Sequence, residues 1–231
     1  NKQQRWNLFR SFAPILTLLF FANLFLTVLQ DVKEDFLVKI IDVNAAGLSP
    51  WVFAKVDGVV TLIILAIFAT LAVMKSHIKV LSVLLTLVIA GAITLSTVAF
   101  NYHTLQLSPL VWLFIQSLCL YFSYLSFQTI FFDRFIACFR INGNVGFFIA
   151  IIDFIGYVGT VSLLSVKELL SVELEWFALY NHMACVVGIF CTVLFTVAGI
   201  LIYRKYLTQI HNKPDTEKPY DLFLNTQYNT I

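Results

Sequence analysis

Residues 80–100 read VLSVLLTLVIAGAITLSTVAF and contain no charged side chain. At about 1.5 Å per residue, a helix of this length measures about 31 Å, and the hydrocarbon core of a bilayer is about 30 Å thick. The run is continuously apolar, whereas a barrel strand alternates between apolar and polar residues over about ten positions. The stretch therefore predicts an α-helix that crosses a membrane.

The composition extends this prediction to the whole chain of 231 residues. Hydrophobic residues make up 60%, charged residues only 12%, and there are 23 phenylalanines. Soluble domains carry about 25% charged residues, which keep their surfaces dispersed in water. A net charge of +2 leaves no basic stripe for a nucleic acid. We expect an integral membrane protein whose first partner is the lipid bilayer.

Six apolar segments appear when the chain is read with a window of about 19 residues. The second is the weakest, because Lys55 and Asp57 lie near its start and only residues 59–74 are cleanly apolar. The predicted fold class is all-α, a polytopic bundle of six transmembrane helices within residues 1–210, followed by a solvated cytoplasmic tail at 211–231. The segments are residues 11–30, 51–74, 80–100, 110–132, 145–166 and 177–203.

The orientation follows from the lysines and arginines, which are enriched in cytoplasmic loops. With the N-terminus inside, only Lys33, Lys39, Lys55 and Lys167 fall on the outer side, and the other 11 of the 15 basic residues fall inside. This bias predicts that both termini are cytoplasmic.

The first outer connection, residues 31–50, is long and mixed. Phe36, Leu37, Ile40 and Ile41 recur with helical spacing between charged residues. This spacing favours continuation of the first helix past the membrane or along its surface. A solvated connector is the alternative.

Signatures of enzymes and metal sites are missing. The four cysteines form no C-x-x-C pair, and the chain has no G-x-S-x-G, H-E-x-x-H or phosphate-loop motif. We therefore expect no catalytic residue, no metal and no cofactor. Asn1 is not an initiator Met, and the first apolar stretch lacks the cleavage site of a signal peptide. We expect that Asn1 marks a cut rather than a natural start.

The deepest ionisable group lies in the fifth segment. Asp153, Gly156, Tyr157 and Thr160 follow at i, i+3, i+4 and i+7 and share one stripe of a helix. Asp153 is about 12 Å from Val145 along the axis. A charge at mid-membrane costs about 2.5 to 3.5 kcal/mol, so a functional role for Asp153 is favoured over helix packing.

Other segments carry polar residues on one face, among them Asn23 in the first and Gln116 in the fourth. For the accompanying Ser, Thr and Gly, close packing between helices is the better interpretation. Lys55 can extend to the outer surface. Asp57 has a shorter side chain, and we expect it to face a cavity.

Residues 131–146 read FFDRFIACFRINGNVG. This loop resembles the cytoplasmic loop between the tenth and eleventh helices of the major facilitator superfamily. The resemblance implies an ion-pair latch formed by Asp133 with Arg134 or Arg140, and close helix contact at Gly143 and Gly146. Anchoring of the loop at the cytoplasmic surface by the two arginines explains the same residues equally well.

The resemblance extends to the topology of six helices and to the basic turn KSHIK at residues 75–79. Over nearly the whole chain, the segments LQDVKEDF (29–36), VDG (56–58), DRF (133–135), GNVGF (143–147) and GYVG (156–159) look like the C-terminal half of a Bacteroidota family of facilitator-like membrane proteins of unassigned function. The basic turn departs from the superfamily because it lacks the full Gly-x-x-x-Asp-Arg pattern. The N-terminal six helices of the superfamily have no counterpart here.

The resemblance implies the C-terminal half of a secondary transporter for a small solute, completed by an N-terminal half or by a second copy. The path would be lined by Asp153, Tyr157, Gln116 and Asn23, with Asp57 near its outer mouth. Asp153 would carry the coupled proton. The alternative is a sensor or assembly subunit that uses the same scaffold without transport, because fold does not dictate function.

Overall fold

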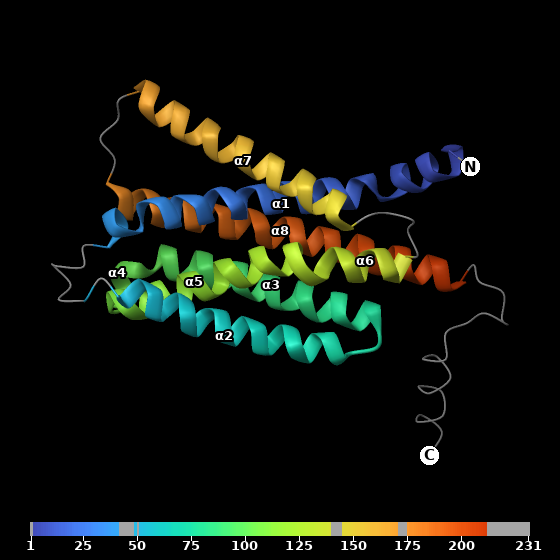
Figure 1. The fold of residues 1–231 in the computed structure, drawn as a ribbon, viewed down its shortest axis with the longest axis horizontal. Coiled ribbons are helices and arrows are strands. Elements are labelled where there is room, and N and C mark those ends of the chain that lie inside the picture. The colour runs from blue at the N-terminus through green and yellow to red at the C-terminus, as the bar shows by residue number, and fades with distance from the viewer. Residues whose placement is uncertain (1, 42–48, 50, 140–144, 171–174, 212–231) are drawn as a thin grey trace, which may run out of the picture.

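The computed structural model describes residues 2–41, 49, 51–139, 145–170 and 175–211. Within these ranges the chain contains helices and no strand. Long helices follow one another in antiparallel succession (Figure 1). Their bounds are α1 Lys2–Ile40, α2 Val52–Val73, α3 His77–Phe100, α4 Tyr102–Leu105, α5 Pro109–Ser126, the π-helix η1 Phe127–Phe131, α6 Phe132–Phe139, α7 Val145–Leu170 and α8 Trp176–His211.

Among the described residues, five stretches are long and apolar enough to cross a membrane. They are Phe12–Phe36, Val52–Val73, His77–Phe100, Pro109–Phe139 and Trp176–Gln209. The sixth predicted segment lies in α7, whose described apolar part, Ile149–Ser165, is shorter. The chain is therefore a multi-pass membrane protein, and the α7 crossing stays a prediction.

Three predicted segments ended too early. The first helix runs to Ile40, which confirms its continuation beyond residue 30 and excludes a solvated connector over residues 31–40. The fourth segment continues as one helix through η1 and α6 to Phe139, and the sixth continues to His211. In each case polar residues extend a helix beyond the stretch that hydropathy detects. The predicted tail at 212–231 lies outside the described residues.

The α3–α5 connection shows how local sequence sets a turn. Gln106 ends α4 with a φ of 45°, in the left-handed region. Ser108 then caps α5, since its Oγ accepts a hydrogen bond from the Val111 N–H at 3.4 Å, and Pro109 starts the helix.

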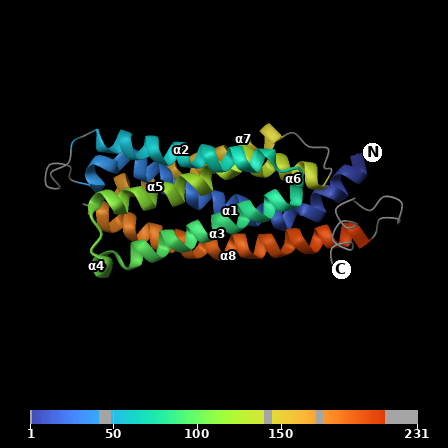
Figure 2. The same ribbon diagram turned by 90° about the horizontal axis from the view of Figure 1, so that it is seen from below.

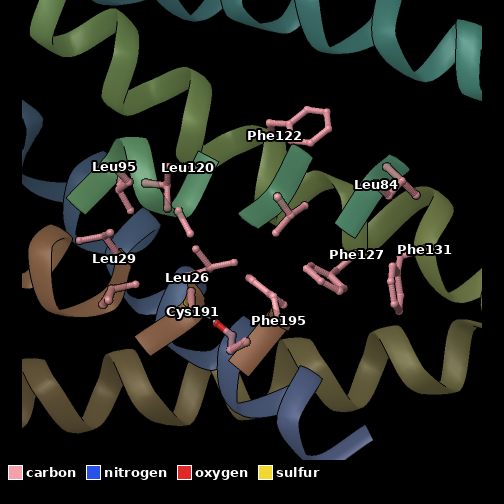
Figure 3. Close-up of a cluster of buried hydrophobic side chains, with 14 of the residues drawn as sticks. Leu26, Leu29, Leu84, Leu95, Leu120, Phe122, Phe127, Phe131, Cys191 and Phe195 are labelled. Carbon is pink, nitrogen blue, oxygen red and sulfur yellow. Dashed lines mark hydrogen bonds between the residues drawn. The ribbon is translucent and has the colours of Figure 1, made fainter. Parts of the chain in front are cut away.

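The apolar core lies between α1, α3, α5 with η1, and α8 (Figure 3). The rings of Phe127 and Phe195 stack with centroids 5.1 Å apart. Gly188 brings α8 close to α3, because a Cβ at this position would lie 2.7 Å from the Ala92 carbonyl oxygen. Small residues permit such close approach between membrane helices.

The remaining helices, α2 and α7, lie on the same side of this core. Figure 1 shows them at opposite edges of the bundle, and Figure 2 shows both on one face. α7 packs on α1, and α2 packs on α5. The face between α2 and α7 is therefore built on α1 and α5, and it carries the charged side chains described next.

Candidate functional site

A lysine is buried inside the helix bundle. The Lys33 residue on α1 is 1% exposed, and its Nζ donates a hydrogen bond to the Tyr121 hydroxyl of α5 at 2.9 Å. The same Nζ lies 4.2 Å from the centroid of the Tyr121 ring and 3.6 Å from Asp57 Oδ1 of α2. We call Lys33, Asp57 and Tyr121 the Lys33 group; it joins three helices around one ammonium ion.

The register of α1 explains why Lys33 is inside. Ala22, Leu26, Leu29 and Lys33 are spaced by four, three and four residues, and each is at most 1% exposed. Once the helix continues past residue 30, this spacing carries Lys33 onto the buried stripe. Lys33 was predicted on the outer side of the membrane, and the structure adds that it belongs to the buried stripe of α1.

A second group surrounds Asp153 on α7. Gln128 Nε2 donates to Asp153 Oδ1 at 2.5 Å and to the Tyr124 hydroxyl at 2.7 Å. Gln128 lies in the π-helix Phe127–Phe131, and π turns inside α-helices are frequent at functional sites. We call Asp153, Gln128 and Tyr124 the Asp153 group.

Contacts between α1 and α7 lie beside the two groups. The Thr160 hydroxyl of α7 donates to Asp31 Oδ2 at 2.5 Å. One turn earlier, a Cβ on Gly156 would lie 2.5 Å from Thr27 Cγ2, so Gly156 is the residue that lets α7 approach α1. Hence two members of the predicted α7 stripe, Gly156 and Thr160, face α1 as expected.

Glu34 on α1 lies near a tyrosine of each group. The Tyr121 hydroxyl is within electrostatic reach of Asp57 and Glu34, and the Tyr124 hydroxyl is within reach of Asp153, Asp31 and Glu34. Tyr121 and Gln128 are separated by about 10 Å along the helix axis. We call the whole set the polar cluster. It comprises Asp31, Lys33, Glu34, Asp57, Tyr121, Tyr124, Gln128, Asp153 and Thr160.

The structure brings Asp153 and Asp57 into this cluster, and places the other path residues elsewhere. Gln116 and Asn23 are fully buried. Gln116 Nε2 donates to the Leu95 carbonyl at 3.4 Å, and Asn23 Nδ2 donates to Thr27 Oγ1 at 3.2 Å. Both leave the side-chain carbonyl oxygen without a partner among the described residues.

Tyr157 lies on the surface of the chain, with 71% of the residue exposed. Successive helical residues are rotated by about 100°, so Tyr157 is turned away from Gly156, which faces α1. Exposure here means that no other part of this chain covers the side chain; in a bilayer such a surface faces lipid or another protein.

The predicted latch is described only in part. Arg140 and Gly143 lie outside the described residues, while Asp133 and Gly146 are exposed. The Arg134 guanidinium donates to the Ala72 carbonyl at 3.1 Å, and its Nη1 lies 3.3 Å from His77 Nδ1. Arg134 therefore ties α6 to the α2–α3 turn, and the ion-pair latch stays a prediction.

Sequence reasoning missed six members of the polar cluster: Asp31, Lys33, Glu34, Tyr121, Tyr124 and Gln128. Tyr121, Tyr124 and Gln128 are spaced by three and four residues and form one stripe of a helix, a signal that was available. Lys33 could have been found by extending the buried stripe of α1. Among the described residues no three His, Cys, Asp or Glu side chains are grouped to hold a metal ion.

The sequence matches a protein family over residues 1–205, and that family is described as a family of unknown function, DUF5690. The chain belongs to this family. No curated protein and no solved structure matches it.

Proposed function

We propose that this chain is the C-terminal six-helix half of a secondary transporter of the facilitator type, which moves a small solute and couples its movement to protons through Asp153. The proposal includes an inner-membrane location with both termini in the cytoplasm, and no enzymatic activity. One observation carries it: side chains of α1, α2, α5 with η1, and α7 gather an ammonium and several carboxyl groups inside otherwise apolar helices.

Energetics support a functional reason for this cluster. Ionisable groups inside membrane helices are costly and mark ion or substrate pathways. Hydrogen bonds that merely hold membrane helices together are worth about 0.6 kcal/mol and are supplied by Ser, Thr, Asn, Gln and His, none of which carries a carboxyl group. The Asp153 group joins α5 and α7 through a carboxyl instead. A carboxyl with one amide donor and a partly exposed position can take up and release a proton.

The arrangement also suits alternating access. Transporters of this type hold substrate near the midplane between two bundles that rock against each other. The helices that contribute to the polar cluster include α2 and α7, which lie on one face of the bundle in Figure 2. A second bundle, either an N-terminal half or another copy of this chain, would cover that face. The intact mass of the natural gene product distinguishes the two, since a continuous two-bundle chain weighs about twice 26.3 kDa.

The test is solute-driven proton movement in proteoliposomes that contain the full natural protein and a trapped pH-sensitive dye. Pools of amino acids, sugars, carboxylates and amines are added in turn. We expect one pool to acidify the lumen, and Asp153→Asn to abolish the signal at unchanged expression. Glu175→Gln is the matched control, because Glu175 is an exposed carboxylate outside the cluster and outside the predicted latch.

Unchanged proton movement in Asp153→Asn would remove Asp153 from the mechanism. If no pool moves protons or exchanges with its labelled counterpart, and the protein copurifies with a stable partner, the assembly-subunit alternative replaces the transporter.

A further inference from the structure

The Lys33 ammonium has N–H donors for which the described residues supply no acceptor within hydrogen-bond distance. An ammonium carries three N–H donors. Among the described residues, Tyr121 accepts one at 2.9 Å, and the nearest carboxylate oxygen, Asp57 Oδ1, is 3.6 Å away, which is too long for a hydrogen bond. The Lys33 side chain is only 2% exposed. A buried cation with this incomplete set of acceptors is poorly compensated.

Other carboxyl groups of the polar cluster each accept a hydrogen bond from a side chain among the described residues. Asp31 accepts from Thr160, Glu34 from Gln30, and Asp153 from Gln128. Lys33 is the one cation of the polar cluster, and its ammonium keeps N–H donors that no described side chain accepts. An anion is the ligand that complements these donors.

Asp57 is placed to give way to such an anion. Its side chain is 37% exposed while that of Lys33 is 2% exposed, so the Asp57 carboxylate lies on the accessible side of the ammonium. The neighbouring Gly58 has open space, since a Cβ there would meet nothing within 4 Å. The partly exposed Asp57 carboxylate is therefore the partner of Lys33 that a solute can reach.

We propose that Lys33 binds the carboxylate group of a small organic acid, which replaces the Asp57 carboxylate beside the ammonium. Tyr121 holds the ammonium in position through its hydroxyl and its ring. The inference rests on the proposed function and names the substrate class: the transported solute carries a carboxylate. Asp57 is then the internal competitor that neutralises Lys33 when the solute has left.

This competition predicts that substitutions of Lys33 and of Asp57 change the affinity for a carboxylate in opposite directions. Lys33→Met removes the cation and should weaken carboxylate binding at least tenfold. Asp57→Asn removes the competitor and keeps the cation, so it should tighten carboxylate binding several-fold. A purely structural ion pair would instead lose binding, or change nothing, in both variants. The two signs keep the inference testable even if one variant fails to fold.

The experiment measures binding to the full natural protein in lipid nanodiscs by equilibrium dialysis. The probes are radiolabelled acetate, lactate, succinate, glutamate and benzoate, with choline and putrescine as cationic counterparts and inorganic phosphate as a second anion. Lys55→Met is the matched control, because Lys55 lies two residues before Asp57 on α2 and is exposed; it should bind like the wild type.

Binding of at least one carboxylate, lost in Lys33→Met and strengthened in Asp57→Asn, supports the inference. It is overturned if no carboxylate binds the wild type, if only the cations or phosphate bind, or if Asp57→Asn weakens the binding. Carboxylate binding without solute movement in proteoliposomes would overturn the transporter proposal alone. The protein could instead move a solute that has no carboxylate, and Lys33→Met could move it at the wild-type rate. That result would overturn this inference and leave the transporter proposal standing.

Discussion

The α3–α8 contact and the polar cluster use similar polar residues in different ways. At the α3–α8 contact, hydroxyl groups bond to their own helix: Ser96 donates to the Ile93 carbonyl, and Thr192 donates to the Gly188 carbonyl. In the polar cluster the bonds cross between helices, as from Lys33 to Tyr121 and from Gln128 to Asp153. The first region is held by shape alone, whereas the second depends on charged partners.

This difference separates stability from function. A contact held by shape has no charge that could bind, release or sense anything, and its role is to keep the bundle closed. A charged contact between helices can be replaced by a ligand or altered by a proton, at the cost of a weaker bundle. The apolar side can therefore act as a rigid support for changes on the polar side.

The largest expected effect is on the apolar side, at Phe195. This residue is fully buried and stacks on Phe127. Phe195→Ala should lower the free energy of unfolding by about 3 kcal/mol, the low end of the range for buried Phe→Ala, because lipid offers an unfolded side chain an apolar surrounding as well. The measurement is reversible unfolding in mixed micelles. A loss below about 1 kcal/mol would show that shape does not hold this contact.

The next prediction compares the effect of a Gly→Ala substitution on the free energy of unfolding at the α3–α8 contact and beside the polar cluster. Gly188→Ala places a Cβ 2.7 Å from a backbone oxygen of α3 and should destabilise the protein by about 1 to 3 kcal/mol. Gly58→Ala, on α2 beside Asp57, meets nothing within 4 Å and should stabilise α2 by up to about 1 kcal/mol through helix propensity. The same unfolding assay gives both values, and effects of equal sign would contradict the comparison.

The sequence predicted the helices of the apolar core better than it predicted the polar cluster. Continuous apolar runs located the helices, since hydropathy and length are local properties. The burial of Lys33 depends on the continuation of α1 beyond its apolar stretch. A hydropathy window does not detect the polar end of a helix, so it could not place Lys33. Asp153 was identified because it is an ionisable residue inside an apolar run. Its partner Gln128 lies in a π-helix, whose position depends on packing between helices.

Tyr157 shows the limit of stripe arguments. It shares a broad stripe with Asp153, Gly156 and Thr160 in the sequence, but the contact of Gly156 with Thr27 fixes the rotation of α7 and leaves Tyr157 exposed. A helical stripe spans an arc, and only tertiary contacts decide which part of the arc faces inward.

The smallest effect is expected at Arg134, which connects the two regions at the α2–α3 turn. α2 contributes Asp57 to the polar cluster and α3 packs on α8, so the turn between them couples the two sides. The planar Arg134 group reaches the Ala72 carbonyl and His77 with two different nitrogens. Lysine keeps the charge but lacks this fork. Arg134→Lys should therefore lower the free energy of unfolding by about 0.5 to 1 kcal/mol, the value of one hydrogen bond. Lys79→Arg, on the exposed surface of α3, is the control.

Hydrogen exchange at the α2–α3 turn is the more sensitive readout. Faster exchange there in Arg134→Lys, without a change in α8, would show that the turn can open locally while the apolar side stays folded. Faster exchange along α3 and α8 together would show that the two regions unfold as one unit, and the separation of rigid support from charged face would then be wrong.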